Sequence, residues 1–265
     1  MKLGPAILFC PADRPDRYAK AADRADTVIL DLEDAVAPER KEAARQAVLD
    51  SSLDPERTIV RVNPFDTNYI VADLRAVKQA GYTRIMLPKC ESAEQVLKLD
   101  PFEVIALCET ARGINAAAQI AAAANVSALM WGAADLTASL GGTSSRHPDG
   151  GYRDVSRFAR AQVLLQAAAH GKGSIDSVYL DIADLDGLRV EAADAAASGF
   201  TAKASIHPSQ MQVIRDAFAP SDEQLDRARR LLAAATGNSG AFTFEGQMVD
   251  EPLLRQARAI VEGGK

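Results

Sequence analysis

The sequence predicts an α/β protein, a (β/α)₈ TIM barrel with a C-terminal helical extension. Eight short apolar runs rich in β-branched residues recur between residues 6 and 206. These runs lack polar alternation, which is typical of parallel strands covered on both faces, and helical patterns lie between them. A doubly wound sheet uses similar units, so the number of repeats is what favours the barrel, a fold that commonly needs about 250 residues.

Each element follows from its own local pattern. Pro38 marks a helix start, and Gly81 and Gly199 mark helix ends. The expected strands are Ala6–Cys10, Thr27–Asp31, Thr58–Val62, Arg84–Pro88, Glu103–Cys108, Ser127–Gly132, Ser174–Leu180 and Thr201–Ile206. The expected helices between them are Arg14–Ala25, Pro38–Leu49, Val71–Ala80, Ala93–Leu99, Ala111–Ala123, Asp154–Ala169 and Leu185–Ala197.

The chain continues beyond the last strand. Helical patterns cover Ser209–Phe218, Asp222–Ala235 and Pro252–Val261, and a glycine-punctuated stretch precedes the last of them. A bare barrel does not need this tail. We therefore expect a barrel over residues 1–220 and a separate C-terminal segment over 221–265.

Composition excludes several classes of protein. The chain has 30 Lys and Arg against 36 Asp and Glu, a net charge of −6, which argues against a broad nucleic-acid surface. The first apolar run is too short for a signal peptide, and no run approaches the ~20 apolar residues of a membrane span. We expect a cytoplasmic protein with no membrane partner, whose three cysteines are free thiols.

Charged residues follow several of the expected strands. In such barrels the active site lies at the carboxyl ends of the strands, so these residues should converge on one rim. Mutual neutralisation in salt bridges is the simpler alternative. The rim residues are Asp31, Glu33, Asp34, Arg61, Asn63, Lys89, Glu109 and Asp135.

Glu109 and Asp135 follow consecutive strands, whose axes lie only ~4.8 Å apart. Two carboxylates this close repel unless a cation or a proton lies between them, and two carboxylates with water and substrate are a usual Mg²⁺ site. Arg61 and Lys89 suit a carboxylate or a developing oxyanion, or else balance the nearby acids. Arg14 and Lys20, at a helix start, suit phosphates, although surface basic residues are usually only solvated.

Seven motifs together resemble the citrate lyase β-subunit-like family, of the aldolase superfamily that contains malyl-CoA and citramalyl-CoA lyases. The resemblance runs from residue 6 to about residue 262 and favours the stand-alone, CoA-using bacterial members. The motifs are Leu8–Arg17, Val28–Val36, Leu87–Lys89, Glu109–Gly113, Trp131–Asp135, Ile206–Gln210 and Phe244–Asp250.

The resemblance implies a Mg²⁺-dependent enzyme that cleaves a β-hydroxyacyl-CoA thioester into a keto acid or aldehyde and an acyl-CoA enolate. It implies that Glu109 and Asp135 bind the metal and substrate, and that Arg61 binds substrate and stabilises oxyanion charge. Glu33 and Asp34 would orient Lys89 and the metal-bound waters. Arg14 and Lys20 would contact CoA.

In related lyases an aspartate on a C-terminal segment reaches a neighbouring subunit and protonates the enolate. Asp250 occupies that motif here, so the resemblance implies a homotrimer or hexamer in which the tail completes the neighbour's active site. Two alternatives stay open. The site could run a condensing, malate-synthase-like or thioesterase-type reaction, or the chain could be the citryl-thioester component of a multi-subunit citrate lyase.

Overall fold

The computed structural model describes residues 3–236 and 240–263. The chain divides into two compact units, Met1–Ile214 and Arg215–Lys265. The boundary falls within helix α10 (Met211–Phe218). Within the described residues, no helix combines the length and the apolar character that crossing a membrane requires.

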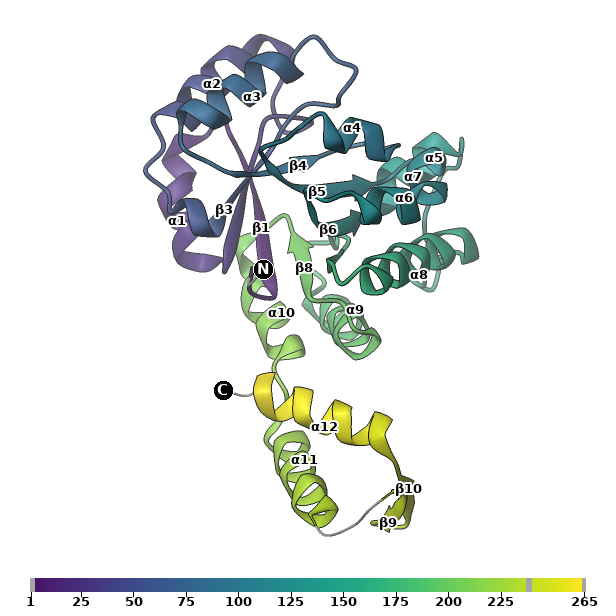
Figure 1. Cartoon of the computed structure of the whole chain (residues 1–265). Coiled ribbons are helices and arrows are strands. Elements are labelled where there is room, and N and C mark those ends of the chain that lie inside the picture. Colours follow the sequence, from purple (N-terminus) through teal and green to yellow (C-terminus); the bar gives the residue numbers. More distant parts are fainter. Residues whose placement is uncertain (1–2, 237–239, 264–265) are drawn as a thin grey trace. The chain divides into compact units, whose positions relative to one another are not determined.

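The first unit is a closed barrel of eight parallel strands in sequence order, as predicted, with helices outside it (Figure 1). Thr27–Asp31 and Glu103–Cys108 have their predicted bounds, whereas the seventh strand ends at Asp176, four residues before the predicted Leu180. The strands are β1 (Ala6–Pro11), β2 (Thr27–Asp31), β3 (Thr58–Arg61), β4 (Arg84–Leu87), β5 (Glu103–Cys108), β6 (Val126–Trp131), β7 (Gly173–Asp176) and β8 (Ala202–Ser205).

The outer helices begin and end where the sequence supplies caps. The side chains of Ser92, Thr110 and Asp184 each accept a backbone N–H of the first helical turn. The helices of this unit are α1 (Tyr18–Arg24), α2 (Lys41–Leu49), α3 (Ile70–Gln79), α4 (Ala93–Leu97), α5 (Ala111–Asn115), α6 (Ala117–Ala122), α7 (Ala133–Ser139), α8 (Asp154–Ala169) and α9 (Leu185–Ser198). Short 3₁₀ turns, η1 (Pro15–Arg17) and η2 (Pro38–Arg40), precede α1 and α2, and η3 (Pro55–Arg57) and η4 (Pro208–Gln210) precede β3 and α10.

Two helices differ from the sequence-based expectation. The expected helix Ala111–Ala123 is divided at Ala116 into α5 and α6. Helix α7 was not predicted, because Gly132 at its start supplies no side-chain cap that would mark a helix directly after the strand. The difference matters for function, since α7 carries Asp135 in its first turn.

Strand register determines which residues meet at the carboxyl rim. Asp31 of β2 is the register partner of Arg61 of β3, and Asp176 of β7 is the partner of Lys203 of β8. Opposite charges thus lie side by side on neighbouring strands. Below the rim, apolar side chains from every strand fill the barrel, among them Ile7, Ile29, Ile59, Met86, Ile105, Met130, Ile175 and Ala204.

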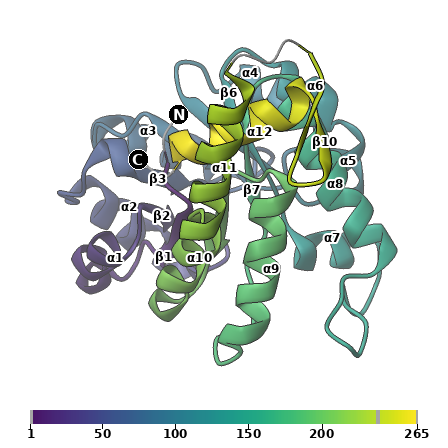
Figure 2. The same cartoon turned by 90° about the horizontal axis from the view of Figure 1, so that it is seen from below.

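The second unit contains α11 (Asp222–Ala235), a hairpin of β9 (Phe242–Phe244) and β10 (Gln247–Val249), and α12 (Glu251–Gly263). Helices α11 and α12 lie beside each other (Figures 1 and 2) and share an apolar core with the hairpin. Ser221 and Gln224 form a capping box at the start of α11. The hairpin was not predicted, because its turn uses Glu245 and Gly246, both at positive φ, rather than Asn-Gly. Residues 237–239 of the glycine-punctuated stretch lie outside the described residues.

Candidate active site

A cavity of about 380 Å³ opens at the carboxyl ends of the strands. Its wall combines apolar side chains with the charged rim residues that the sequence singles out, Arg61, Glu109 and Asp135 included. Barrel enzymes build their active sites at this end. The lining residues are Phe9, Pro11, Asp31, Asp34, Ala35, Arg61, Leu107, Glu109, Met130, Gly132, Ala133, Ala134, Asp135, Ser177, Val178 and Ile206.

Arg61 is a fixed cation in this wall. Its Nε and Nη2 donate to the two oxygens of Asp31. Its Nη1 forms an ion pair with Glu33 Oε2 at 2.8 Å, but the angles of this contact are not those of a hydrogen bond. Burial alone would lower the pKa of Arg61, but the charges of Asp31, Glu33 and Glu109 and the Asp31 hydrogen bond outweigh it and raise that pKa. The guanidinium therefore stays charged and immobile beside the cavity.

Glu109 is buried directly after β5. Its Oε1 accepts the Lys89 backbone N–H at 3.1 Å, and its side chain lies on Gly132, where a Cβ would come within 2.5 Å of Oε2. Only glycine leaves room for the carboxylate at that position. Burial raises the pKa of Glu109 to about 8, and the negative charges of Asp135 and Glu33 add to the effect.

Lys89 lies among three carboxylates. Its ammonium pairs with Glu33, and its Nζ is 3.6 Å from Asp34 Oδ2 and 3.5 Å from Asp135 Oδ1. Burial opposes the charge of Lys89, but the Glu33 hydrogen bond and the surrounding acids raise its pKa. Burial also raises the pKa of Glu33, an effect that Arg61 and Lys89 partly reverse.

The site fits a hard divalent cation. Glu109 and Asp135 bring two carboxylates to one cavity, and burial together with the charges of Asp135 and Glu33 raises the pKa of Glu109 despite the opposing charges of Arg61 and Lys89. Among residues 3–236 and 240–263, no three His, Cys, Asp or Glu side chains are close enough to form a larger ligand group. One or two carboxylates plus water and substrate oxygens are the usual Mg²⁺ ligands.

A second cavity, of about 300 Å³, shares Phe9 and Pro11 with the first and contains Lys20. Arg17 lines it as well and was missed in the sequence, where it reads as an ordinary surface residue. Arg14 is not among its lining residues: its exposed guanidinium donates to both oxygens of Asp16, at 3.0 and 2.9 Å. His207 also lines this cavity and caps the 3₁₀ turn η4, since its Nδ1 accepts the Ser209 backbone N–H at 3.2 Å.

Asp250 belongs to the second unit. It is half-buried, directly precedes α12, and its backbone carbonyl accepts the Leu254 N–H at 3.1 Å. Its role in a neighbouring subunit remains a prediction from the motif.

Buried charged residues behind the rim were also missed. Lys41 Nζ donates to the Leu32 and Glu33 carbonyls and to Asn63, at 2.6–2.8 Å. The sequence gives no signal for Lys41, since a lysine at a helix start is normally solvated. For Lys203 the sequence does give a signal, because a charged residue within the short apolar run Thr201–Ile206 must be buried with a partner.

Comparison with known proteins shows the family of the chain. Residues 6–208 match the HpcH/HpaI aldolase/citrate lyase family. The chain is 57% identical to a citrate lyase subunit beta-like protein of Mycobacterium tuberculosis over 258 residues, which cover 97% of this chain and 94% of the relative. It is 34% identical to human mitochondrial citramalyl-CoA lyase, over 97% of this chain and 84% of that protein.

A solved structure is similar over nearly the whole chain. The crystal structure of CitE from M. tuberculosis, in complex with magnesium, acetoacetate and coenzyme A, superposes with a TM-score of 0.96 at 56% identity, covering 99% of this chain and 98% of that one. Fold, rim chemistry and sequence similarity lead to one conclusion: the chain belongs to the HpcH/HpaI aldolase/citrate lyase family of lyases.

Proposed function

We propose that the chain is a Mg²⁺-dependent carbon–carbon lyase that cleaves a β-hydroxyacyl-CoA thioester of the malyl-CoA or citramalyl-CoA type. The observation that carries the proposal is the buried carboxylate of Glu109, seated on Gly132 in the same cavity as Asp135 and Arg61. Magnesium and coenzyme A in the similar CitE structure support it, as does the citramalyl-CoA lyase activity named for the human relative.

In this proposal Glu109 and Asp135 hold the Mg²⁺. When bound, the ion supplies Lewis-acid stabilisation of negative oxygen on the keto acid. The substrate hydroxyl loses its proton, the carbon–carbon bond breaks, and the keto acid leaves. The acyl-CoA remains as an enolate.

The chain's own charges complete the electrostatics. Arg61, fixed by Asp31, places a permanent positive charge where oxyanion charge develops. Glu33 holds the Lys89 ammonium in place, with Asp34 and Asp135 close to it. Lys89 in turn fixes Glu109 through its backbone N–H.

The enolate needs a proton, and Asp250 of a neighbouring copy is the proposed donor. The hydroxyl proton passes to solvent, and Asp250 gives its proton to the enolate carbon and is reprotonated from solvent, so the protons balance over one turnover and cleavage needs no other reactant. The Phe244–Asp250 motif and the compact fold of the second unit around its own core support this role. A homotrimer or hexamer would then be the active form.

The second cavity is the proposed entry for CoA. Lys20 and Arg17 provide positive charge for phosphates, and the residues it shares with the main cavity connect it to the reacting carbon. We place Arg14, which is engaged by Asp16, at the margin of this contact.

The test is an assay of the purified protein with Mg²⁺ on malyl-CoA, citramalyl-CoA and 3-hydroxy-3-methylglutaryl-CoA. We expect release of a keto acid and an acyl-CoA from at least one ester, lost on chelation with EDTA. Free CoA released together with keto-acid consumption would instead indicate a condensing or hydrolytic enzyme. Inactivity on every CoA ester, with activity on an acyl-carrier-protein thioester, would identify a citrate lyase component.

A further inference from the structure

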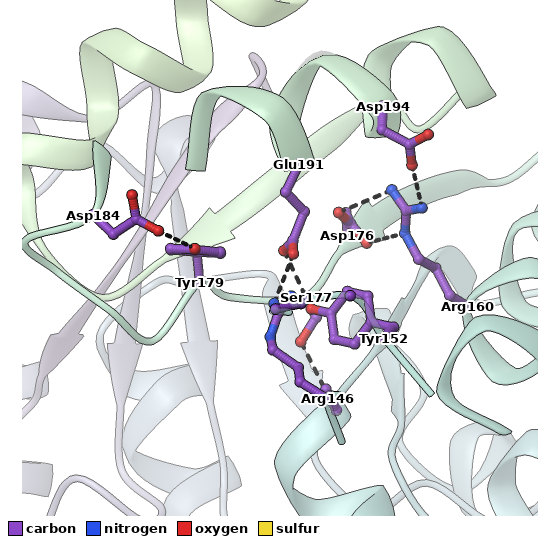
Figure 3. Close-up of polar contacts among 12 residues, drawn as sticks. Arg146, Tyr152, Arg160, Asp176, Ser177, Tyr179, Asp184, Glu191 and Asp194 are labelled. Atoms are coloured by element: carbon purple, nitrogen blue, oxygen red, sulfur yellow. Dashed lines mark hydrogen bonds and ion pairs between the residues drawn. The ribbon is translucent and has the colours of Figure 1, made fainter. Parts of the chain in front are cut away.

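A second cluster of charged residues lies behind the rim, between β7, β8 and α9 (Figure 3). Lys203 is fully buried, and its ammonium donates to Asp176 Oδ2 at 3.0 Å, to Glu191 Oε1 at 2.9 Å and to the Ser177 carbonyl at 2.7 Å. Asp176 is equally buried and also accepts from Arg160 at 2.9 Å. Neither Asp176 nor Lys203 is among the residues that line the main cavity.

Two hydrogen bonds connect this cluster to the start of α7. Trp131, the last residue of β6, donates from Nε1 to Asp176 Oδ1 at 2.7 Å. Ala133, the first residue of α7, donates its backbone N–H to Ser177 Oγ at 3.3 Å. The two attachments lie on either side of Gly132.

Gly132 connects the two carboxylates of the proposed metal site. It packs on the Glu109 side chain, and the helix that starts after it carries Asp135 in its first turn. A shift of the chain at Gly132 therefore moves Asp135 relative to Glu109. Rotation of the Trp131 side chain or loss of the Ser177 contact would permit such a shift.

We propose that Asp176 and Lys203 are positioning residues that fix Gly132 and α7, and thereby set the separation of Glu109 and Asp135 and the affinity of that pair for Mg²⁺. This inference rests on the proposed function. Lys203 acts twice, by holding Asp176 for Trp131 and by holding the Ser177 carbonyl so that the Ser177 hydroxyl faces Ala133. Outer hydrogen-bond partners of metal ligands commonly influence affinity in this way.

The test uses variants that cut the two attachments without removing a buried charge. Trp131→Phe removes the indole donor and keeps an aromatic ring against Tyr152, and Ser177→Ala removes the acceptor for Ala133. Asp194→Asn is the matched control, because Asp194 pairs with Arg160 on the outer side of the same cluster and is 60% exposed. Mg²⁺ binding is measured by isothermal titration calorimetry, and folding by circular dichroism and thermal unfolding.

We expect the Trp131→Phe and Ser177→Ala double variant to bind Mg²⁺ at least about tenfold more weakly than the unmodified protein. Each single variant should show a smaller loss of Mg²⁺ affinity, and Asp194→Asn should bind Mg²⁺ like the unmodified protein. Trp131 is the chain's one tryptophan, so its indole ¹⁵N–¹H signal gives a second readout. In the unmodified protein the indole signal should shift during the Mg²⁺ titration, and the midpoint of this shift should match the midpoint measured by calorimetry.

Two outcomes overturn different statements. Suppose that the unmodified protein binds Mg²⁺ without a change in its Trp131 indole signal, and that the folded variants bind Mg²⁺ within twofold of the unmodified protein. The positioning role is then wrong, and the cluster only supports the barrel. If the unmodified protein does not bind Mg²⁺ at all, the proposed function itself fails. If the Trp131 variant does not fold, Ser177→Ala decides together with the Trp131 indole signal, because Ser177 also lines the main cavity. Mg²⁺ binding within twofold of the unmodified protein overturns the proposal, and weaker binding with an altered indole response supports it.

Discussion

Arg61 and Asp31 form a two-point ion pair at the carboxyl ends of β3 and β2, with Nε–Oδ1 at 2.7 Å and Nη2–Oδ2 at 2.6 Å. Strand register makes these two residues direct neighbours, and both side chains are nearly buried. The pair leaves the guanidinium no freedom to reorient. Its positive charge is therefore in place before substrate arrives, which is the condition for electrostatic stabilisation without reorganisation.

Arg61→Lys should lower kcat about 100-fold, because lysine keeps the charge but cannot bind both Asp31 oxygens in one plane. Steady-state kinetics on the best CoA ester measures the effect. Arg57→Lys, on a guanidinium that donates to the backbone carbonyls of Ala25 and Asp26 away from the cavity, is the control and should leave kcat unchanged. A kcat within threefold for Arg61→Lys would contradict the role of fixed charge.

Asp135→Asn should abolish detectable Mg²⁺ binding and turnover, since it removes one of the two carboxylates of the proposed metal site. The fold should survive, because Asp135 is about one-third exposed and contributes little to the core. Calorimetry and circular dichroism measure the two effects separately. Asp34→Asn, which also changes a carboxylate in the cavity wall, should weaken Mg²⁺ binding much less.

Lys20→Ala should raise KM for the acyl-CoA about tenfold with a smaller effect on kcat, because a charge-assisted contact to a phosphate is lost from both ground and transition states. Arg17→Ala should raise KM for the acyl-CoA to a similar extent. Arg14→Ala should change KM less, since its guanidinium is already paired with Asp16. The defect should shrink at high salt, where phosphate contacts are screened. An equal rise in KM for Arg14→Ala and Lys20→Ala would mean that CoA contacts Arg14 as closely as it contacts Lys20.

Asp250→Asn should slow turnover strongly and leave Mg²⁺ affinity unchanged, since the proposed role of Asp250 is to deliver a proton. If Asp250 acts on a neighbouring copy, coexpression of Asp250→Asn with Asp135→Asn should restore part of the activity. The mixed oligomers would contain sites with an intact metal pair and an intact donor. Near-normal rates for Asp250→Asn alone would show that another group supplies the proton.

The barrel could be predicted from the sequence because each short apolar run is a strand that the closed parallel sheet buries. Residues such as Ile29, Ile59 and Ile105 lie in short apolar runs, and their burial inside a closed parallel sheet is what those runs predict. Glu109 and Asp135 follow consecutive strands, so topology alone brings them to one cavity.

The parts that the sequence could not predict depend on long-range geometry. The division of the rim charges into the Arg61–Asp31 pair and the Lys89–Glu33 pair follows from side-chain packing across strands, which periodicity does not encode. Arg14 pairs locally with Asp16 and does not line the second cavity, which the basic character of the segment does not reveal. Helix α7 was missed because its start is fixed by a tertiary contact, the Ser177 hydroxyl, rather than by a capping residue of its own.

The buried carboxylate of Asp176 should make stability depend on acid pH. Burial alone would raise the pKa of Asp176, but Lys203, Arg160 and the Trp131 hydrogen bond together lower it below 3.8. A lowered folded-state pKa contributes stability that is complete above the unfolded value and is lost as the pH falls through the folded value. Asp176→Asn removes the carboxylate that Lys203 and Arg160 share and leaves Lys203 with Glu191 and Arg160 with Asp194, so we expect a loss of about 1.5–3 kcal/mol in the free energy of unfolding at pH 7.

The difference between the two proteins should begin to narrow below about pH 4, because the Asp176 carboxyl of the unfolded unmodified protein then binds a proton that the folded protein binds only at lower pH. Urea unfolding of both proteins from pH 7 to pH 3 measures it. Asp154→Asn is the control: Asp154 is exposed and pairs with Arg157 on its own helix, so this variant and the unmodified protein should have similar free energies of unfolding at every pH. If the difference in free energy of unfolding between Asp176→Asn and the unmodified protein stays constant down to pH 3, the hydrogen-bond geometry of the carboxyl, and not its charge, stabilises the barrel.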